Sequence, residues 1–555
     1  MWAILTYVGY AILGLATCMA LAAGGLFTFL HLRWKSSRNP SLPLLGPLTF
    51  PLGSVSHFAS LASFAGIRRE FNLYRHIQTA FDNPSRFLLP PLQRVTTSND
   101  DDALNDDDGE GQPRAFQLFL GPRSIIVVRK RADIEATLKS KVAVARMVSP
   151  MGNLLFEQMG IVFVSDMAKH KAHRSAALRG LMRPSYLRNL YSSTMVPVVS
   201  QFLAHLENSA PNSGLPQVMD VEAISGITLE VIGEATLSLA LGCFPRPNIP
   251  TQEPVLREFR SAVSGLLRGL AFFQSKPSFL MRFYSTEYNN ALSSKATVRA
   301  FMESFIDARV QDRVNNTLPA DHQDDFLDVM LDGDTSSSAG SGSGNSEHFT
   351  RADIAFTLQD MMIAGHETTS HTVAWALFFL AQDEGLQARI YAEVTSSDWG
   401  VDGHPEFNSL SSFDLLHSTI KETLRCRPTV PSLPRRTLED TVINGIEVPA
   451  NTTVFCALAT LGMDPTEYAN PTVFNPDRWL ENPSLKTPLP FGAGPRSCVG
   501  ERMALVEAKL ILAMFIRAYT FDLVTPVSDV GSFQAITMHP DPELLLNIHR
   551  RPTTT

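Results

Sequence analysis

The chain begins with 32 mostly apolar residues that include no Lys, Arg, Asp or Glu. Because about 20 apolar residues, each rising about 1.5 Å, are enough to cross the core of a bilayer, the pattern predicts a transmembrane helix over residues 1–32. Arg33, Lys35 and Arg38 follow directly, and the positive-inside rule then places the rest of the chain in the cytosol. The alternative is a cleaved signal peptide, because Ala20-Leu21-Ala22 resembles a cleavage site, although the segment lacks a basic start.

Three polar or proline-rich segments interrupt the apolar pattern. Residues 33–48 are basic and then rich in proline, which predicts a stiff, extended hinge. Residues 98–111 carry a run of acids, and residues 333–345 are rich in Ser and Gly. Because both segments are too polar to bury, we expect them to be disordered insertions within one large domain, residues 49–555.

Helical periodicity dominates the remaining sequence. Residues 353–380 indicate a long apolar helix with a polar interruption in its middle, and residues 415–426 indicate a shorter helix. From about residue 195 to 313 the pattern is that of successive amphipathic helices. Short alternating stretches at 441–449 predict a small sheet. The expected fold is therefore mainly α-helical with small β-sheets.

Composition and charge narrow the class of protein. Hydrophobic residues make up 44% of the chain and charged residues 18%, which is enough apolar material for a large core. The five cysteines are few and odd in number, so they do not indicate a disulfide framework. The net charge of -8 comes almost entirely from the acid run between residues 100 and 110. The rest of the chain has no basic excess that would indicate nucleic-acid binding.

One cysteine stands in a setting that favours metal binding. Cys498 follows a loop rich in Gly and Pro and opens an apolar, helix-periodic run. Free backbone N–H groups at a helix N-terminus stabilise a thiolate, so this sulfur can bind iron. Gly494 and Gly500 allow a sharp turn and the close approach of a flat cofactor, and Arg496 can reach a cofactor carboxylate. The alternative is a buried structural cysteine.

This stretch resembles the haem-binding loop of the cytochrome P450 family. The family pattern Phe-x-x-Gly-x-Arg-x-Cys-x-Gly is matched by Phe491, Gly494, Arg496, Cys498 and Gly500. The resemblance extends over nearly the whole chain after residue 48. It implies the cytochrome P450 fold, a haem b (iron protoporphyrin IX) cofactor held by these residues, and Cys498 as the axial ligand of the haem iron.

The polar interruption of the long helix resembles the I-helix motif of the same family. By that resemblance, Ala364 and Gly365 keep the helix close to the haem and allow a local kink. Thr368 and Glu367 are the expected catalytic residues: the hydroxyl holds water or stabilises iron-bound oxygen, and the carboxyl relays protons. The alternative is a Ser/Thr patch hydrogen-bonded to its own helix. His366 is expected to face away from the iron.

A basic helix opening at residue 165 and continuing through Arg183 resembles the C-helix of the family. His170 and Arg174 hold the i,i+4 spacing that places two donors over a haem propionate, with His in place of the usual Trp. For His170 the alternative is a solvated basic face. By position in the family, Arg435 is expected to meet a propionate, and Arg436 is the less favoured neighbour.

Two further groups of charged residues have roles implied by the resemblance. Glu422 and Arg425 lie three residues apart on one helix, and Arg478 completes the family's structural ion-pair motif. By the same resemblance, Lys169, Lys171 and Arg179 are expected to face a redox partner with an acidic surface.

The resemblance implies a monooxygenase that inserts one oxygen atom of O2 into a lipophilic molecule such as a sterol, fatty acid or terpenoid. Electrons would come from NADPH through a separate cytochrome P450 reductase, with cytochrome b5 as a further candidate partner. The catalytic domain would face the cytosol from the endoplasmic reticulum membrane. Two alternatives are a reductase-independent isomerase or dehydratase of the same family and a non-catalytic haem-binding membrane protein.

Overall fold

The computed structural model groups the chain into two units, residues 1–147 with 432–457 and residues 148–431 with 458–555. The sequence pattern predicted one domain over residues 49–555 and did not separate them, and that prediction stays untested. The structure describes these residues: 44–45, 88–89, 114–120, 123–146, 150–209, 217–245, 254–273, 278–319, 322, 324–333, 349–397, 399–400, 403–534, 537–542 and 544–552.

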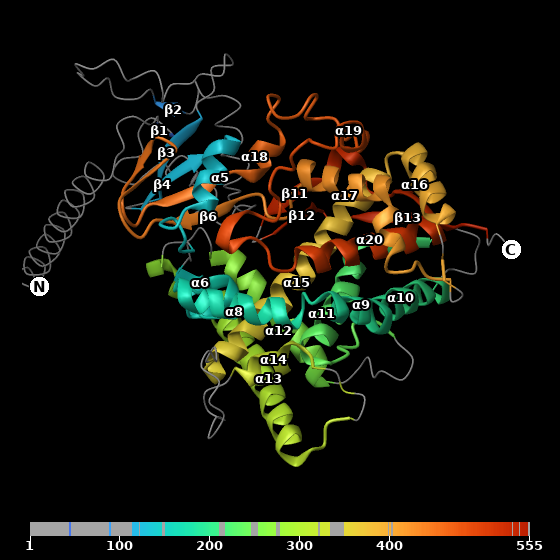
Figure 1. The fold of residues 1–555 in the computed structure, drawn as a ribbon, viewed down its shortest axis with the longest axis horizontal. Helices are drawn as coiled ribbons and strands as arrows, with labels where there is room; N and C mark the ends of the chain where they lie inside the picture. The colour runs from blue at the N-terminus through green and yellow to red at the C-terminus, as the bar shows by residue number, and fades with distance from the viewer. Residues whose placement is uncertain are drawn as a thin grey trace, which may run out of the picture. The chain divides into compact units, whose positions relative to one another are not determined.

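A six-stranded sheet with strand order β2-β1-β3-β4-β9-β6 forms the first unit (Figure 1). Its central strands, β3 and β4, are antiparallel and rich in β-branched and aromatic residues, which suit a pleated and buried surface. The elements of this unit are β1 (Leu44–Leu45), β2 (Leu88–Leu89), β3 (Ala115–Leu120), β4 (Arg123–Val128), α5 (Arg131–Lys139), β6 (Leu433–Arg436), β7 (Thr441–Ile443), β8 (Ile446–Val448) and β9 (Thr453–Cys456).

The small sheet predicted at 441–449 is confirmed as the hairpin β7–β8. Its two-residue turn consists of Asn444 and Gly445, both with positive φ, at 48° and 80°. Asn-Gly is the residue pair that tolerates this backbone best, so the local sequence alone is sufficient to set the hairpin register.

The second unit is mainly helical and carries two small sheets, β10-β13-β5 and β11-β12. Its helices are α6 (Pro150–Phe156), α7 (Gly160–Phe163), α8 (Met167–Gly180), α9 (Pro184–Leu190), η3 (Tyr191–Met195), α10 (Val196–Asn208), η4 (Val221–Ala223), α11 (Ile224–Leu237), α12 (Pro254–Phe273), η5 (Ser278–Phe283), α13 (Ser285–Asn315), α14 (Phe326–Asp332), α15 (Arg351–Leu380), α16 (Glu384–Ser396), η6 (Ser409–Ser412), α17 (Asp414–Cys426), α18 (Leu458–Gly462), α19 (Asp477–Glu481), η7 (Gly494–Arg496), α20 (Glu501–Ala518) and η8 (Val527–Asp529). Its strands are β5 (Gln217–Asp220), β10 (Tyr519–Leu523), β11 (Gly531–Gln534), β12 (Met538–Asp541) and β13 (Leu545–Arg550).

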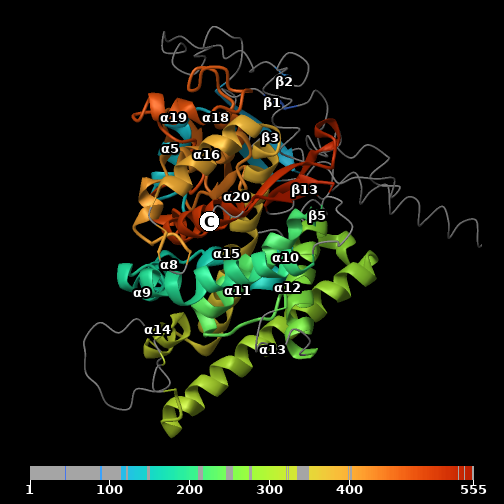
Figure 2. The ribbon, with the colours of Figure 1, turned by 90° about the vertical axis from the view of Figure 1, so that its right-hand side faces the viewer.

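Helix α15 is the centre of the second unit. A capping box starts it: Thr350 accepts from the backbone N–H of Asp353, and the Asp353 carboxylate accepts from the backbone N–H of Thr350. The helix packs against α11 on one side and α20 on the other, as both views show (Figures 1 and 2). Most of its side chains are buried, so polar groups on it need partners inside the protein.

A buried ion network joins α13 to α14. Arg309 donates to Asp325 at 2.8 Å and to Asp328 at 2.5 Å, and Arg313 donates to Asp328 at 2.9 Å. Among the described residues, His322, Asp324 and Asp328 are close enough together to hold a metal ion. Because two guanidinium groups already neutralise Asp328, we interpret this cluster as structural.

The structure confirms a mainly α-helical fold with small sheets. The basic helix is shorter than predicted: α8 ends at Gly180, and Arg183 is the N-cap of α9, where Pro184 starts a new helix. In the described ranges, no helix is both long and apolar enough to cross a membrane. The predicted anchor at 1–32 lies outside the described residues, as do nearly all of the hinge at 33–48 and of the insertions at 98–111 and 333–345.

Candidate functional site

The loop that carries Cys498 folds back on itself. The backbone N–H of Cys498 donates to the carbonyl oxygen of Phe491 at 2.8 Å, which closes the loop. Gly494 adopts a φ of 71°, a left-handed conformation that glycine tolerates without strain. Helix α20 begins at Glu501 with Gly500 as its N-cap, so Cys498 lies two residues before the cap.

The electrostatics of the sulfur differ from the expectation based on the helix end alone. Burial raises the pKa of the Cys498 thiol, while hydrogen bonds from the backbone N–H groups of Gly500 and Glu501 and the charge of Arg174 lower it, and the pKa ends above its usual value. The Cys498 side chain is nevertheless accessible. A metal cation bound at this sulfur would favour its ionised form.

Gly500 keeps the space beside this sulfur open. Its φ of -90° is available to any residue, so backbone strain does not require glycine here. A Cβ at this position would lie 4.0 Å from the Cys498 Sγ, on the side of the residue that faces the sulfur. The role that the sequence predicted for Gly500, to let a flat cofactor approach the sulfur, stays a prediction.

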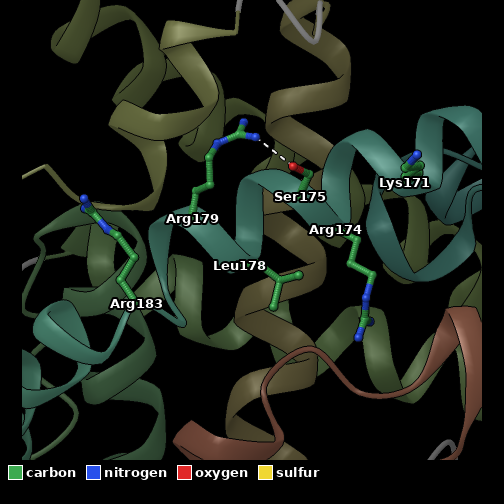
Figure 3. A pocket seen from close by; sticks show the side chains of 6 residues that line it. All are labelled: Lys171, Arg174, Ser175, Leu178, Arg179 and Arg183. Carbon is green, nitrogen blue, oxygen red and sulfur yellow. Dashed lines mark hydrogen bonds between the residues drawn. The ribbon is translucent and has the colours of Figure 1, made fainter.

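Helix α8 is tied to the Cys498 loop by arginine side chains. Arg174 donates through Nη1 to the carbonyl oxygen of Ser497 at 2.5 Å and through Nη2 to its hydroxyl at 3.1 Å. Figure 3 shows Arg174 pointing away from Lys171 and Arg179, toward the loop before α20. Arg496 is buried and donates to the carbonyl oxygen of Val164, just before α8, at 2.5 Å. Arg174 from α8 and Arg496 from the loop thus link the two segments in both directions.

His170 is buried one turn before Arg174, so it does not belong to a solvated basic face. Sequence reasoning missed its neighbour His173, whose Nδ1 lies 2.7 Å from the Thr357 Oγ1 on α15. The exposed Lys169 also contacts α15, with its Nζ 3.5 Å from the Asp353 Oδ1. These contacts fix α8 against α15. They join residues 184 positions apart, and no local pattern in the sequence indicated them.

The middle of α15 carries an accessible patch on an otherwise buried helix. Ala364 is exposed and Thr368 is half-buried, although most of the helix around them is buried. The Thr368 hydroxyl donates to the carbonyl oxygen of Ala364 at 2.8 Å, as in the alternative of a self-bonded patch. Its lone pairs remain able to accept, so this bond does not exclude the predicted role.

Gly365 and His366 both face α11. A Cβ on Gly365 would lie 2.7 Å from the Ile232 Cγ1, so glycine is required here for helix packing. The His366 Nδ1 lies 2.9 Å from the carbonyl oxygen of Met362, and burial lowers the pKa of this ring. The Thr228 hydroxyl of α11 donates to the carbonyl oxygen of His366 at 3.0 Å. The exclusion of His366 from the predicted site agrees with this packing.

Glu367 has a strongly perturbed carboxyl group. Burial raises its pKa to about 7, against a hydrogen bond from the Thr537 hydroxyl that lowers it. The Thr537 Oγ1 lies 3.1 Å from the Glu367 Oε2. A carboxyl with a pKa near neutrality can both release and take up a proton at physiological pH, which suits a proton relay.

The predicted ion-pair motif is assembled around Glu422, which is fully buried. Arg425 donates to both of its carboxylate oxygens, at 2.9 and 2.7 Å, and Arg478 donates at 3.0 Å. Sequence reasoning missed two further donors, the Trp479 Nε1 at 3.0 Å and the backbone N–H of Asn475 at 2.9 Å. One carboxylate thus holds α17, α19 and the segment between them in place.

Arg435 lies in the first unit, which contains residues 432–457. It lies on β6, is 1% exposed, and its Nη2 atom has no hydrogen-bond partner among the described residues. Burial lowers the pKa of its guanidinium group. A buried cation in this state requires an anion, which fits the predicted contact with a propionate. Arg436 is less buried and bonds to Asn451 at 3.4 Å.

Comparison with known proteins identifies the family. The family model "Cytochrome P450" matches residues 113–547. The haem domain of cytochrome P450DA, a crystal structure, superposes with a TM-score of 0.69 over 92% of this chain and 98% of that chain, at 19% sequence identity.

Two curated relatives are similar over most of their length. The chain is 27% identical over 411 residues to mouse "Sterol 26-hydroxylase, mitochondrial", covering 70% of this chain and 72% of the relative. It is 29% identical over 358 residues to rat "25-hydroxyvitamin D-1 alpha hydroxylase, mitochondrial", covering 61% and 67%.

Proposed function

The chain belongs to the cytochrome P450 family, and from that membership we propose that Cys498 supplies the thiolate ligand of its haem iron. Family and fold make it a haem-dependent monooxygenase that uses O2 and a lipophilic substrate. The observation that carries the proposal is the accessible side chain of Cys498, which lies two residues before the N-cap of α20 in a loop that Arg174 holds through Ser497.

The residues of the chain fit a haem. Arg174 and Arg496 supply positive charge for its propionates, and Arg435 stays a candidate for a propionate contact through its position in the family. His170 supports the α8 side of the site. Phe491, Gly494 and Gly500 shape the loop beside the sulfur, and Ala364 and Gly365 shape the opposite wall; these residues complete the proposed cofactor site.

When bound, haem supplies the iron at which O2 is reductively activated, and a thiolate ligand favours O–O cleavage. The chain's own contribution is proton delivery. The Glu367 carboxyl holds a proton near neutral pH and passes it toward the Thr368 hydroxyl through water. The Thr368 Oγ1 accepts that hydrogen bond while it donates to the Ala364 carbonyl oxygen.

The substrate class that we favour is the sterols and their derivatives, because the two relatives described above are named for sterol and vitamin D hydroxylation. Fatty acids and terpenoids are the alternatives. With a panel of sterols and 25-hydroxyvitamin D, NADPH, an electron donor and isotopically labelled O2, we expect a product that carries one labelled oxygen atom. Mass spectrometry of the products measures whether the labelled oxygen atom is incorporated.

A product that forms without NADPH and donor, and carries no label, would instead support the isomerase or dehydratase. No product from the sterol panel, with a labelled product from fatty acids or terpenoids, would overturn the sterol proposal alone.

We propose an endoplasmic reticulum membrane location, because residues 1–32 fit a transmembrane anchor followed by basic residues. NADPH–cytochrome P450 reductase, with cytochrome b5, would then donate electrons. The alternative is a mitochondrial location with a ferredoxin as donor, because the two relatives carry mitochondrial names.

The outer side of α8 is the proposed donor-docking surface. A pocket there is lined by Lys171, Arg174, Ser175, Leu178, Arg179 and Arg183, and its apolar member, Leu178, is exposed (Figure 3). Positive charge around an apolar centre suits a donor with an acidic surface. Lys169 contributes less to the positive charge of this docking surface, because its ammonium group is paired with Asp353.

Reversing two charges of this surface should slow electron delivery. For the double variant Lys171→Glu with Arg179→Glu, we expect the donor concentration at half-maximal turnover to rise about 10-fold at low ionic strength. Arg282→Glu, which reverses another exposed cation on η5, is the matched control. Titration of turnover with donor measures the effect; an equal response of both proteins would place docking elsewhere.

A further inference from the structure

One face of α15 is tied to the segment 537–539 by three successive contacts. The Thr537 hydroxyl donates to the Glu367 Oε2 at 3.1 Å, and the His539 ring lies 5.2 Å from the His371 ring. The Trp375 Nε1 donates to the carbonyl oxygen of Met538 at 3.1 Å. The three α15 residues are spaced four apart, at 367, 371 and 375, so they share one face of the helix.

The same segment is held from its other side. The backbone N–H of Met538 donates to the carbonyl oxygen of Thr429 at 2.8 Å, after the end of α17. Strand β12 pairs with β11 in an antiparallel ladder that begins at Met538 and Gln534. Thr537 itself is 4% exposed. These contacts hold the backbone at Thr537 in place beside Glu367.

We propose that Thr537 is a positioning residue for Glu367: its hydroxyl occupies the Oε2 oxygen and directs proton exchange to the Oε1 oxygen. The inference rests on the proposed proton relay through Glu367. It adds a residue 170 positions away in sequence to that relay.

The groups around Glu367 determine how the hydrogen bond from Thr537 should change the pKa of its carboxyl group. Glu222 on η4 disfavours the ionised carboxylate, His366 and His371 lie on its own helix, and His539 lies on β12. Burial raises the Glu367 pKa to about 7, and the hydrogen bond from Thr537 opposes that rise. A donor to a carboxylate stabilises its ionised form, so removal of the donor should raise this pKa further.

Infrared difference spectroscopy of the full, haem-loaded chain over a pH series tests the inference without a known substrate. The C=O band of protonated Glu367 is assigned by its absence in Glu367→Gln. In Thr537→Val we expect its titration midpoint to move up by about 0.5 to 1 pH unit, the worth of one hydrogen bond. Thr537→Ser, which keeps a donor, should return the midpoint toward the wild-type value.

Ser532→Ala removes a hydroxyl from the same hairpin, on β11, and serves as the matched control. Thr537→Ala is a second variant if the valine does not give a folded haem protein. An unchanged midpoint in every folded variant that lacks the hydroxyl overturns the inference. Separately, an unchanged pH profile of NADPH oxidation in Glu367→Gln would overturn the proton relay, while the infrared midpoint still decides the role of Thr537.

Discussion

Cys498→Ala should abolish the red-shifted absorption band that carbon monoxide gives with the reduced protein, and turnover should disappear with it. The band requires a thiolate on the iron, and among the cysteines that the structure describes Cys498 alone is exposed: Cys426 and Cys456 are buried, and Cys243 is half-buried. Since loss of a group that only supports a metal ligand already costs about 10- to 100-fold, loss of the ligand should exceed 100-fold.

The difference spectrum of dithionite-reduced membranes measures this effect. Cys243→Ala is the matched control, because this cysteine is only half-buried and lies in the same unit. A band that persists in Cys498→Ala, or its absence from folded, haem-loaded wild type, would refute the ligand assignment. That result would favour the alternative of a non-catalytic haem-binding membrane protein.

Glu422→Gln should be the most destabilising of the charge-neutralising substitutions. The carboxylate is fully buried, and Arg425 and Arg478 depend on it for charge compensation. Breaking a buried pair by removing one partner leaves an uncompensated buried charge and costs about 3 to 5 kcal/mol. Loss of one carboxylate here leaves two guanidinium groups without their anion, so we expect the upper part of that range.

Thermal unfolding of the haem-loaded protein, followed by loss of the carbon monoxide band, measures the change. Glu439→Gln removes an exposed carboxylate and should leave the midpoint within experimental error. If Glu422→Gln unfolds at the wild-type temperature, the network does not contribute to stability. Its role would then be limited to the conformation of the segment before α19.

The sequence predicted those parts of the site whose members lie close together along the chain. The loop from Phe491 to Gly500, the helix at 353–380 and the hairpin at 441–449 each carry their own local signal. Glu422 and Arg425 share a helix face, which periodicity alone establishes. Arg478 was added by resemblance to the family, and the structure brings it to the same carboxylate.

Contacts between distant segments could not be predicted in this way. His173 meets Thr357, and Thr537 meets Glu367, only because helices and a hairpin pack in three dimensions. Gly365 was interpreted as a residue that approaches the haem, and the structure gives it a packing role against Ile232 as well. The balance of burial against backbone donors at the Cys498 sulfur also depends on the whole fold.

The hydrogen bond from the Cys498 N–H to the Phe491 carbonyl oxygen has a consequence for how this loop can vary. It closes a ring of fixed length, and the positive φ values of Gly492 and Gly494 bend the chain to fit that ring. Substitutions inside the ring can keep its closure, whereas inserting or deleting one residue would shift the sulfur relative to α20. The position of the sulfur therefore depends on the number of residues between Phe491 and Cys498 as well as on which residues they are.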